Sequence, residues 1–164
     1  MSSAAVTTLL AGRSLISTLQ APLRTIQSCA SMTENTLPKS PPQIEPTVRT
    51  IAMPSDANPH GDIFGGWLLS QMDLAGMTVT TRRSNGRTVT VAITGMTFQR
   101  PVFVGDEVSC YATLLKVGHT SLTVNIQSWV RRGVGGDQIA VTEGVFTYVA
   151  VDADGKPRPV PSDS

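Results

Sequence analysis

The chain has 164 residues, a length that suits a single domain with its own hydrophobic core. Its formal net charge is +1 and charged residues make up 15% of the sequence, a balance that argues against a nucleic-acid-binding surface. No apolar run approaches the length of a membrane-spanning helix. The two cysteines, Cys29 and Cys110, fit neither a disulfide framework nor a metal-ligand spacing, and the two histidines lie far apart, which argues against a zinc site.

The first 46 residues differ in composition from the rest of the chain. Residues 1–33 contain no Asp or Glu and are rich in Ser, Thr and Ala, so residues 1–31 resemble a mitochondrial transit peptide that would direct the protein to the matrix. Alternatively, Met32 is the true start of a cytoplasmic protein. In both cases residues 1–46 form an extension that ends in a linker, which we expect not to pack against the domain at residues 47–164; its prolines are Pro38, Pro41, Pro42 and Pro46.

The rest of the chain predicts one strand, one long helix and four further strands. The first strand is expected over Val48–Met53, and the helix from Gly65 to about Arg83. Four β-rich runs follow a break at Asn85–Gly86, namely Thr88–Phe98, Glu107–Val117, Ser121–Arg132 and Ile139–Val151. One long apolar helix with about five long strands predicts an α+β fold in which an antiparallel sheet wraps around the helix.

Asp73 is the only charged residue in the segment from Gly65 to Met77, which is otherwise typical of a buried helix. At about 100° per residue, apolar side chains fall on nearly every side of this helix. A carboxylate that leaves water loses free energy unless it is paired or takes part in chemistry. Asp73 is therefore either held by a structural hydrogen bond or acts as a catalytic carboxylate in an apolar site. The loop before the helix favours the catalytic interpretation.

That loop runs from Asn58 directly into Gly65 and Gly66 at the start of the helix. Both glycines are poor helix formers, and their missing side chains let another group approach the first-turn N–H groups, which lie at the positive end of the helix dipole. We expect these amides to polarise a carbonyl group on which negative charge develops. Asp62 is predicted to cap the helix by accepting a hydrogen bond from the Gly65 amide, with lining of the site as a second polar group as the alternative. Asn58 is expected to shape the turn, with orientation of water as the alternative.

Gly66 and Asp73 fall on the same face of the helix, but seven residues separate them by roughly 10 Å along its axis. One carbonyl carbon therefore cannot touch both groups of the same helix. If the two cooperate, Asp73 comes from one subunit and the glycine amides come from a second, antiparallel copy. The sequence thus predicts an active site between two identical subunits.

A set of short blocks, specific together although each is weak alone, covers about residues 47–161. They are Arg49–Pro54, Gly61–Trp67, Ser70–Asp73, Gly95–Phe98 with Arg100 and Pro101, Val104–Asp106, Lys116–Gly118 with Thr120 and Ser121, Trp129–Val130, Tyr148–Asp152 and Gly155–Arg158. As a set they resemble the hotdog-fold acyl-CoA thioesterases, in particular the short YciA-like type. Two features depart from that pattern: His60 occupies a loop position where Asn is expected, and the N-terminal extension has no counterpart.

The resemblance implies a hotdog fold that hydrolyses the thioester between coenzyme A and a broad range of acyl groups. It also implies a homodimer, usually one of three in a hexamer, and no metal or redox cofactor, because coenzyme A is part of the substrate. It places the catalytic carboxylate at Asp73, which is expected to activate water or to attack the carbonyl directly. Candidate contacts to coenzyme A, each with a solvated or hairpin role as the alternative, are Arg100, Gly118, Thr120, Ser121, Lys156 and Arg158.

Two other functions compete with this interpretation. A hotdog dehydratase of 3-hydroxyacyl substrates would use His60 and Asp73 to remove and return protons, but the loop lacks the dehydratase sequence His-Phe-Pro. A non-catalytic subunit that binds acyl-CoA is the third hypothesis, and the intact Asp73 argues against it.

Overall fold

The structure is a computed structural model that describes residues 37–162. The expectations for residues 1–31, Met32 and Cys29 concern positions outside the described residues. Within residues 37–162, no helix is long and apolar enough to cross a membrane.

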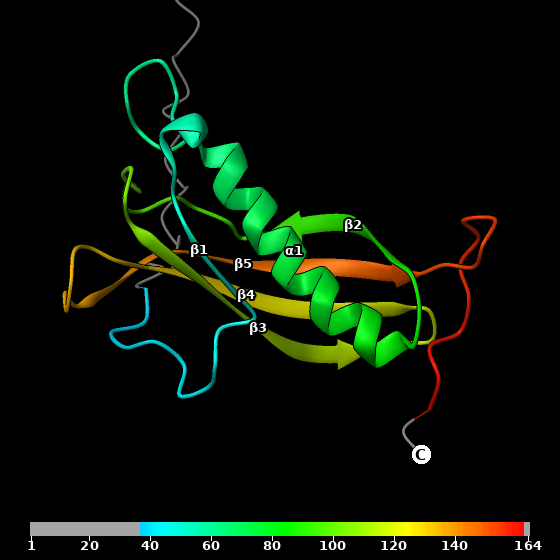
Figure 1. Cartoon of the computed structure of the whole chain (residues 1–164). Coiled ribbons are helices and arrows are strands. Elements are labelled where there is room, and N and C mark those ends of the chain that lie inside the picture. Colours follow the sequence, from blue (N-terminus) through cyan, green and yellow to red (C-terminus); the bar gives the residue numbers. More distant parts are fainter. Residues whose placement is uncertain (1–36, 163–164) are drawn as a thin grey trace, which may run out of the picture. The chain divides into compact units, whose positions relative to one another are not determined.

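The described chain contains one long helix, one short 3-10 helix and five strands. In chain order they are β1 (Val48–Ile51), η1 (Pro54–Asp56), α1 (Gly65–Ser84), β2 (Thr88–Thr94), β3 (Glu107–Val117), β4 (Ser121–Arg131) and β5 (Gln138–Ala150). The strands form one antiparallel sheet in the order β1-β3-β4-β5-β2, and α1 lies across it (Figure 1). The predicted α+β architecture is therefore confirmed.

Most predicted boundaries agree with the structure, but β2 is shorter than expected. β3 has the predicted bounds, and α1 ends at Ser84 rather than at about Arg83. β2 stops at Thr94 instead of Phe98, because Gly95 adopts a φ of 68° that turns the chain away from β5. A register shift after Thr90, which leaves Val91 as the extra residue, also bends this strand.

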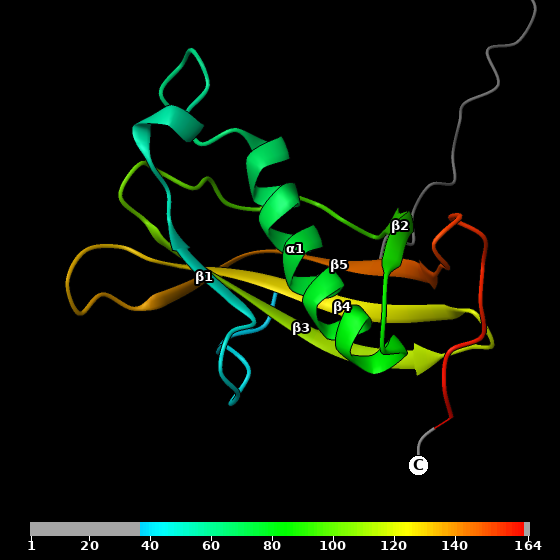
Figure 2. The ribbon, with the colours of Figure 1, turned by 45° about the vertical axis from the view of Figure 1, so that its right-hand side comes forward.

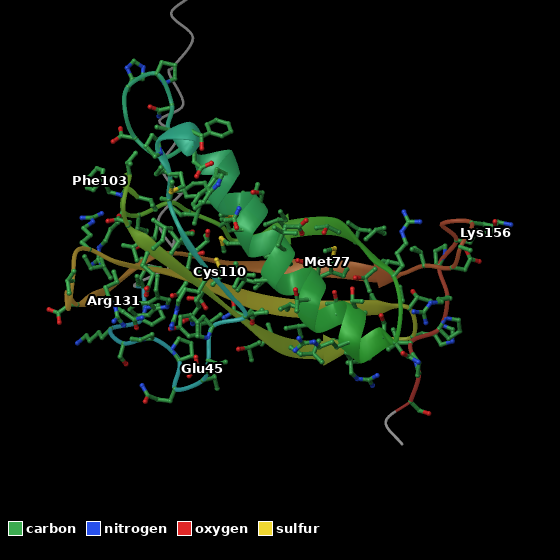
Figure 3. The ribbon with its side chains drawn as sticks, viewed as in Figure 1. Glu45, Met77, Phe103, Cys110, Arg131 and Lys156 are labelled. Atoms are coloured by element: carbon green, nitrogen blue, oxygen red, sulfur yellow. The ribbon has the colours of Figure 1, made fainter. Side chains whose placement is uncertain are left out.

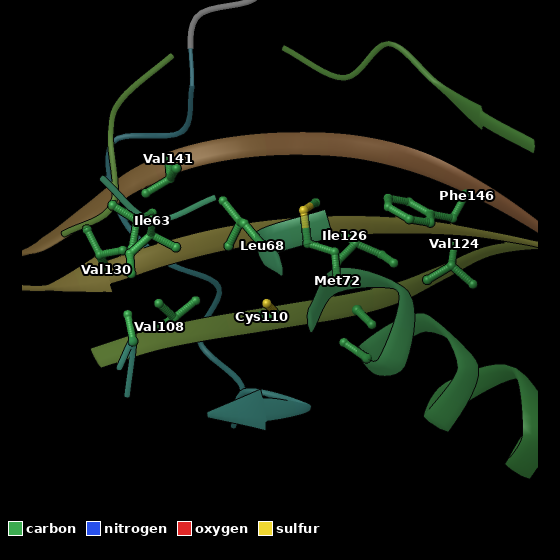
Figure 4. Close-up of a cluster of buried hydrophobic side chains, with 14 of the residues drawn as sticks. Ile63, Leu68, Met72, Val108, Cys110, Val124, Ile126, Val130, Val141 and Phe146 are labelled. Carbon is green, nitrogen blue, oxygen red and sulfur yellow. The ribbon is translucent and has the colours of Figure 1, made fainter. Parts of the chain in front are cut away.

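Figure 2 shows α1 in front of the sheet in a view turned by 45° from Figure 1. The hydrophobic core lies between α1 and the inner face of the sheet, and Figure 4 shows part of it in close-up. Leu68, Met72 and Ala75 are the buried apolar residues of the helix, and they pack against residues that alternate along the strands, such as Ile126 and Phe146. The only cysteine in the described part, Cys110, also lies in this core, where its Sγ atom is 3.3 Å from the Ser128 hydroxyl. Burial raises the pKa of the Cys110 thiol to about 11, so Cys110 acts as a small core residue.

One side of α1 is apolar but uncovered in the single chain. Leu74 is 46% exposed and Met77 is 40% exposed, so the expectation that the helix is buried all round is wrong for one subunit. The neighbouring edge strand β2 likewise exposes Val91 and Ile93. The sheet has one inner face and can cover only one side of the helix, so the other side requires another chain to leave water.

The predicted cap of α1 by Asp62 is wrong. The N-cap residue is Phe64, and no side-chain hydrogen bond caps the helix. Asp62 instead forms an isolated antiparallel bridge with Phe103. The Asn58 side chain closes the loop by accepting hydrogen bonds from the backbone N–H groups of His60 and Asp62, at 2.9 and 3.2 Å, so Asn58 has the predicted turn role. The bridge between Asp62 and Phe103 holds Asp62 in an extended segment, two residues before the N-cap residue Phe64.

The expectation that the proline-rich linker does not pack against the domain is wrong at Leu37. Leu37 is only 8% exposed and forms a second apolar cluster with Tyr111, Trp129 and Ala140. In β3, Tyr111 alternates with the inward-facing Cys110 and Ala112, so this cluster lies on the outer face of the sheet. The prolines marked a break in regular structure correctly, but they did not reveal that an apolar residue ahead of them packs with two buried aromatic side chains.

The side chain of Arg158 contacts the C-terminal end of α1. Its Nη2 atom donates to the carbonyl oxygen of Ser84 at 2.9 Å, and its Nε atom donates to the carbonyl oxygen of Val151 at 3.2 Å. Ser84 is the last residue of the helix, where carbonyl groups lack helical partners and the dipole favours a cation. Arg158 therefore ties the C-terminal segment to the helix.

We expect Leu37→Ala to lower the free energy of unfolding by about 1–2 kcal/mol, because it removes most of a buried leucine side chain from the outer cluster. Val134→Ala, which shortens a fully exposed side chain, is the control and should change stability by less than about 0.5 kcal/mol. Urea unfolding followed by tryptophan fluorescence measures both changes. Equal stability of the two variants would show that residue 37 does not pack on the sheet.

Replacing Arg158 by Ala should lower the melting temperature, because the Ser84 and Val151 carbonyl groups lose a charged donor, a loss of about 1.5–3 kcal/mol. Lys156→Ala removes a cation two residues away whose side chain is exposed, and it should leave the melting temperature unchanged. Arg158→Lys should recover only part of the loss, since an ammonium group cannot reproduce the planar fork. A melting temperature that falls equally in the Arg158→Ala and Lys156→Ala variants would contradict this role.

Candidate active site

Asp73 lies in the middle of α1, and its half-buried side chain accepts hydrogen bonds from two hydroxyl groups. The Oγ1 atom of Thr90 in β2 donates to Oδ1 of Asp73 at 2.6 Å. The hydroxyl group of Tyr148 in β5 lies 3.1 Å from the same Oδ1 atom and 3.1 Å from the backbone carbonyl oxygen of Asp73. Thr90 and Tyr148 are directly opposite each other in the β2–β5 ladder, so two adjacent strands present their hydroxyl groups to one carboxylate oxygen.

Tyr148 is fully buried and remains a hydrogen-bond donor. Burial, reinforced by the negative charge of Asp73, raises the pKa of the Tyr148 hydroxyl well above its ordinary value. The phenol group therefore keeps its proton at any physiological pH. The Tyr148 side chain beside Asp73 is thus always neutral.

Gly76 allows this approach between strand and helix. A Cβ atom at Gly76 would overlap the hydroxyl group of Tyr148, and it would lie 2.7 Å from the Cδ1 atom of Ile126. Sequence reasoning did not identify Tyr148, Thr90 or Gly76 as site residues. A glycine inside a long helix was the available signal, because it weakens the helix and so indicates close contact with another segment. Thr80, one turn after Gly76 on the buried side of α1, bonds to Thr88 at 2.9 Å.

A comparison with Asp106 shows what is distinctive about Asp73. Asp106 is also shielded from water, but the guanidinium group of Arg132 lies 3.2 Å from its Oδ2 atom and the Phe103 amide donates to the same atom. A cation compensates that charge, so Asp106 is a structural carboxylate. Among the described residues, only the neutral hydroxyl groups of Thr90 and Tyr148 bond to the side chain of Asp73. Within residues 37–162 no salt bridge to a cation compensates the charge of Asp73, which suits a group that must accept a proton.

The predicted amide donors lie in the first turn of α1. The Trp67 and Leu68 amides donate to the carbonyl oxygen of Phe64, whereas no hydrogen bond within residues 37–162 is donated by the Gly65 or Gly66 amide. The ring of Phe64 lies over Gly66, where a Cβ atom would overlap it, and a Cβ atom at Gly65 would be 3.6 Å from the ring of Phe98. The structure thus leaves the two predicted donors without a protein partner in this chain, between two aromatic rings.

Two cavities flank this turn and contain other predicted residues. A cavity of about 380 Å³ is lined by Asn58, Phe64 and Trp67 among others. A smaller one of about 110 Å³ brings Arg100 next to Gly65, and Arg100 also donates from Nη1 to the carbonyl oxygen of Ala140 at 3.1 Å. Asn58 and Arg100 are therefore near the glycine amides.

The remaining predicted residues lie at the opposite end of α1. The Gly118 amide donates to the carbonyl oxygen of Ser121 at 2.7 Å in the β3–β4 hairpin, and Thr120 accepts from the Ala150 amide at 2.8 Å. Arg158 reaches the helix C-terminus from the final segment, and Lys156 is exposed in the turn before it, far from Phe103 at the other end of the molecule (Figure 3). A helix of 20 residues spans about 30 Å, so one chain separates these residues from the glycine amides by nearly its full length.

Comparison with known proteins identifies the group of proteins to which this chain is related. The Thioesterase superfamily pattern matches residues 60–135. The acyl-CoA thioester hydrolase YciA of Salmonella typhimurium is 54% identical over 123 residues, which cover 73% of this chain and 92% of the relative. The hexameric thioesterase y2039 from Yersinia pestis is 54% identical, with a TM-score of 0.70 over 77% of this chain and all of the other. A hexameric broad-specificity acyl-coenzyme A thioesterase is 43% identical, with a TM-score of 0.70 over 78% of this chain and 86% of the other.

These similarities extend over nearly the whole length of the relatives and include both the helix that carries Asp73 and the sheet behind it. Because a relative that is 54% identical is covered over 92% of its length, this chain belongs to the YciA family of hotdog-fold acyl-CoA thioester hydrolases.

Proposed function

We propose that this protein hydrolyses the thioester bond of acyl-CoA and releases coenzyme A and a carboxylic acid, with Asp73 as the catalytic carboxylate. The observation that carries this proposal is the half-buried Asp73 side chain, which is fixed by two neutral hydroxyl groups and has no cation of this chain beside it. That arrangement belongs to a fold whose relatives are acyl-CoA thioester hydrolases.

In the proposed mechanism, Asp73 removes a proton from a water molecule while the oxygen atom of that water attacks the thioester carbonyl carbon. The Gly65 and Gly66 amides at a helix start donate to the carbonyl oxygen as it becomes negative. The tetrahedral intermediate then expels coenzyme A as a thiolate, which takes the proton that Asp73 accepted. Coenzyme A belongs to the substrate, so the mechanism uses no additional cofactor. A broad range of acyl groups is part of the proposal, in line with the broad-specificity relative.

The active site requires two subunits. The uncovered side of α1, with Leu74 and Met77, and the free edge of β2, with Val91, form the apolar surface that a second copy would cover. An antiparallel arrangement of two helices brings the glycine amides of one subunit to Asp73 of the other, across the roughly 10 Å that separates them in one chain. The assembly is a homodimer within a hexamer, as in the hexameric relatives.

The same pairing supports a proposal for coenzyme A binding. It brings the C-terminal end of one α1 toward the N-terminal end of the other, so Gly118, Thr120, Ser121 and Lys156 would approach the substrate that lies on the glycine amides. The exposed ammonium group of Lys156 is available for a phosphate. Arg158 is a weaker candidate because three of its nitrogen atoms already donate to carbonyl groups.

The cellular location also belongs to the proposal. Translation from Met32 would give a cytoplasmic protein, whereas a transit peptide at residues 1–31 would direct it to the mitochondrial matrix.

The dehydratase hypothesis is not favoured. His60 is exposed in its loop, and its only hydrogen bond within the described residues runs from its backbone N–H group to Asn58. A dehydratase would require the imidazole to share the site with Asp73. A non-catalytic subunit is not favoured either, because the positioning of Asp73 by two hydroxyl groups serves no evident purpose in a protein that only binds.

Asp73→Asn should lower the rate of thiol release from acyl-CoA by about 100-fold or more, because the amide keeps the shape of the side chain but cannot accept the proton. His60→Asn should have little effect, since His60 only shapes the loop. Asp154→Asn, in an exposed turn, is the matched control for the loss of one negative charge. Loss of activity in His60→Asn as complete as in Asp73→Asn, with normal folding and assembly, would overturn the hydrolase assignment in favour of a dehydratase.

Mixed subunits should recover activity that neither parent has. Asp73→Asn lacks the base and Gly66→Pro removes a glycine amide, so a dimer with one subunit of each type keeps one intact site. After subunit exchange, thiol release should return to about a quarter of the wild-type rate at equal mixing, because half of the dimers are mixed and each has one of two sites. Exchange is verified by native mass spectrometry. No recovery despite verified exchange would show that each site lies within one subunit.

A further inference from the structure

The two carboxylate oxygen atoms of Asp73 have different surroundings. Oδ1 accepts from Thr90 at 2.6 Å and lies 3.1 Å from the Tyr148 hydroxyl group, whereas no hydrogen bond from residues 37–162 reaches Oδ2. A carboxylate held at only one oxygen has a fixed plane and a defined free lone pair. This asymmetry determines which atom can meet a water molecule.

We propose that Tyr148 and Thr90 are positioning residues that hold Oδ1 of Asp73, so that Oδ2 is the oxygen that takes the proton from the attacking water. This inference rests on the proposed hydrolase function and adds to it the residues that orient the base. Neither hydroxyl group is assigned a contact with the substrate.

Tyr148 has the stronger structural case. It is fully buried, so its hydroxyl group must find a partner, and it lies equally close to the side-chain oxygen and the backbone carbonyl oxygen of Asp73. The Tyr148 hydroxyl group therefore fixes both the backbone and the carboxylate of Asp73, a residue 75 positions earlier in the sequence. Gly76 keeps the path of the hydroxyl group open, since a Cβ atom there would overlap it.

Thr90 supplies the second donor from an exposed position on the edge strand. Thr90 is the last residue of β2 before the register shift, and its side chain faces the helix. Two residues earlier, Thr88 bonds to Thr80 of α1 at 2.9 Å, so the start of β2 is fixed to the helix at two points. The bulge lets the rest of β2 turn away without moving Thr90 from Asp73.

The surroundings of Asp73 contain one other titratable side chain that touches it. β2 contributes Thr90, β5 contributes Tyr148, β4 contributes Ile126 beside Gly76, and the preceding turn of α1 contributes Leu69. Tyr148 keeps its proton, so it adds no charge of its own to the surroundings of Asp73.

The test compares Tyr148→Phe and Thr90→Val with the wild-type chain, by thiol release from acyl-CoA as a function of pH. Each substitution should lower kcat by about 10-fold or more with little change in KM, because a misplaced base acts poorly on a bound substrate. Each should also move the acid limb to higher pH. A hydrogen-bond donor favours the charged carboxylate, so its loss lets the carboxylate take a proton at a higher pH.

Matched variants separate positioning from a structural role. Tyr111→Phe removes a phenol hydroxyl group from the outer face of the sheet and should leave kcat and the acid limb unchanged. Thr90→Ser keeps the hydroxyl group and should restore activity relative to Thr90→Val. The double variant Tyr148→Phe with Thr90→Val should lose less than the product of the single losses, because both residues act on one oxygen.

Infrared difference spectra recorded against the Asp73→Asn protein give a readout that does not depend on activity. The carboxylate band of Asp73 should shift in Tyr148→Phe and should convert to the protonated band at higher pH than in the wild type. If the wild type released no thiol but the band shifted, the hydrolase proposal would fail and the positioning role would stand. If Tyr148→Phe and Thr90→Val both kept the wild-type kcat, acid limb and carboxylate band, the positioning role would be wrong. Should Tyr148→Phe not fold, Thr90→Val and its serine counterpart decide the question alone.

Discussion

The arrangement of this protein depends on the contact between Gly76 of α1 and Tyr148 of β5. An α-helix packs against a sheet at a distance set by the side chains between them, and here a missing side chain lets the Tyr148 hydroxyl group reach the helix backbone. The contact fixes the height of α1 above the sheet at the turn that carries Asp73. The same phenol group then bonds to the carboxylate, so core packing and the geometry of the catalytic group are set by one residue.

A second constraint follows from the number of layers. One helix on one sheet buries one side of the helix, but α1 is apolar on its other side as well, at Leu74 and Met77. The free edge strand β2 adds the exposed side chain of Val91 to this uncovered apolar surface. A chain with this pattern gains free energy by pairing with a copy of itself, and in the proposed antiparallel pairing the positive end of one helix lies near the carboxylate of the other. The stretch of α1 from Gly65 to Met77, in which Asp73 is the only charged residue, therefore presents uncovered apolar side chains to a second copy of the chain.

The electrostatic difference between the two shielded aspartates is equally instructive. Asp106 faces the Arg132 guanidinium group and helps to hold a loop, whereas Asp73 faces two neutral hydroxyl groups. The carboxylate of Asp106 is bound by a cation, whereas that of Asp73 is bound at one oxygen atom by neutral hydroxyl groups, and no hydrogen bond from residues 37–162 reaches its other oxygen. The identity of the neighbours, rather than burial alone, separates the structural carboxylate of Asp106 from the proposed catalytic carboxylate of Asp73.

The sequence by itself determined the order and type of the elements, since helix and strand periodicity are local properties: β3 has its predicted bounds and α1 is within one residue at its end. It also singled out Asp73, because one charge in an apolar helix is visible without a structure, and the helical rise alone indicated two subunits. The tertiary structure decided which residues meet across long stretches of chain. Tyr148 reaches Asp73 from 75 residues away, Leu37 covers the outer face of the sheet, and Arg158 binds the end of α1 instead of staying free for a phosphate. Asp62 missed the helix cap because a bridge to Phe103 holds its backbone extended. Each of these depends on register and packing between distant segments, which local periodicity does not encode.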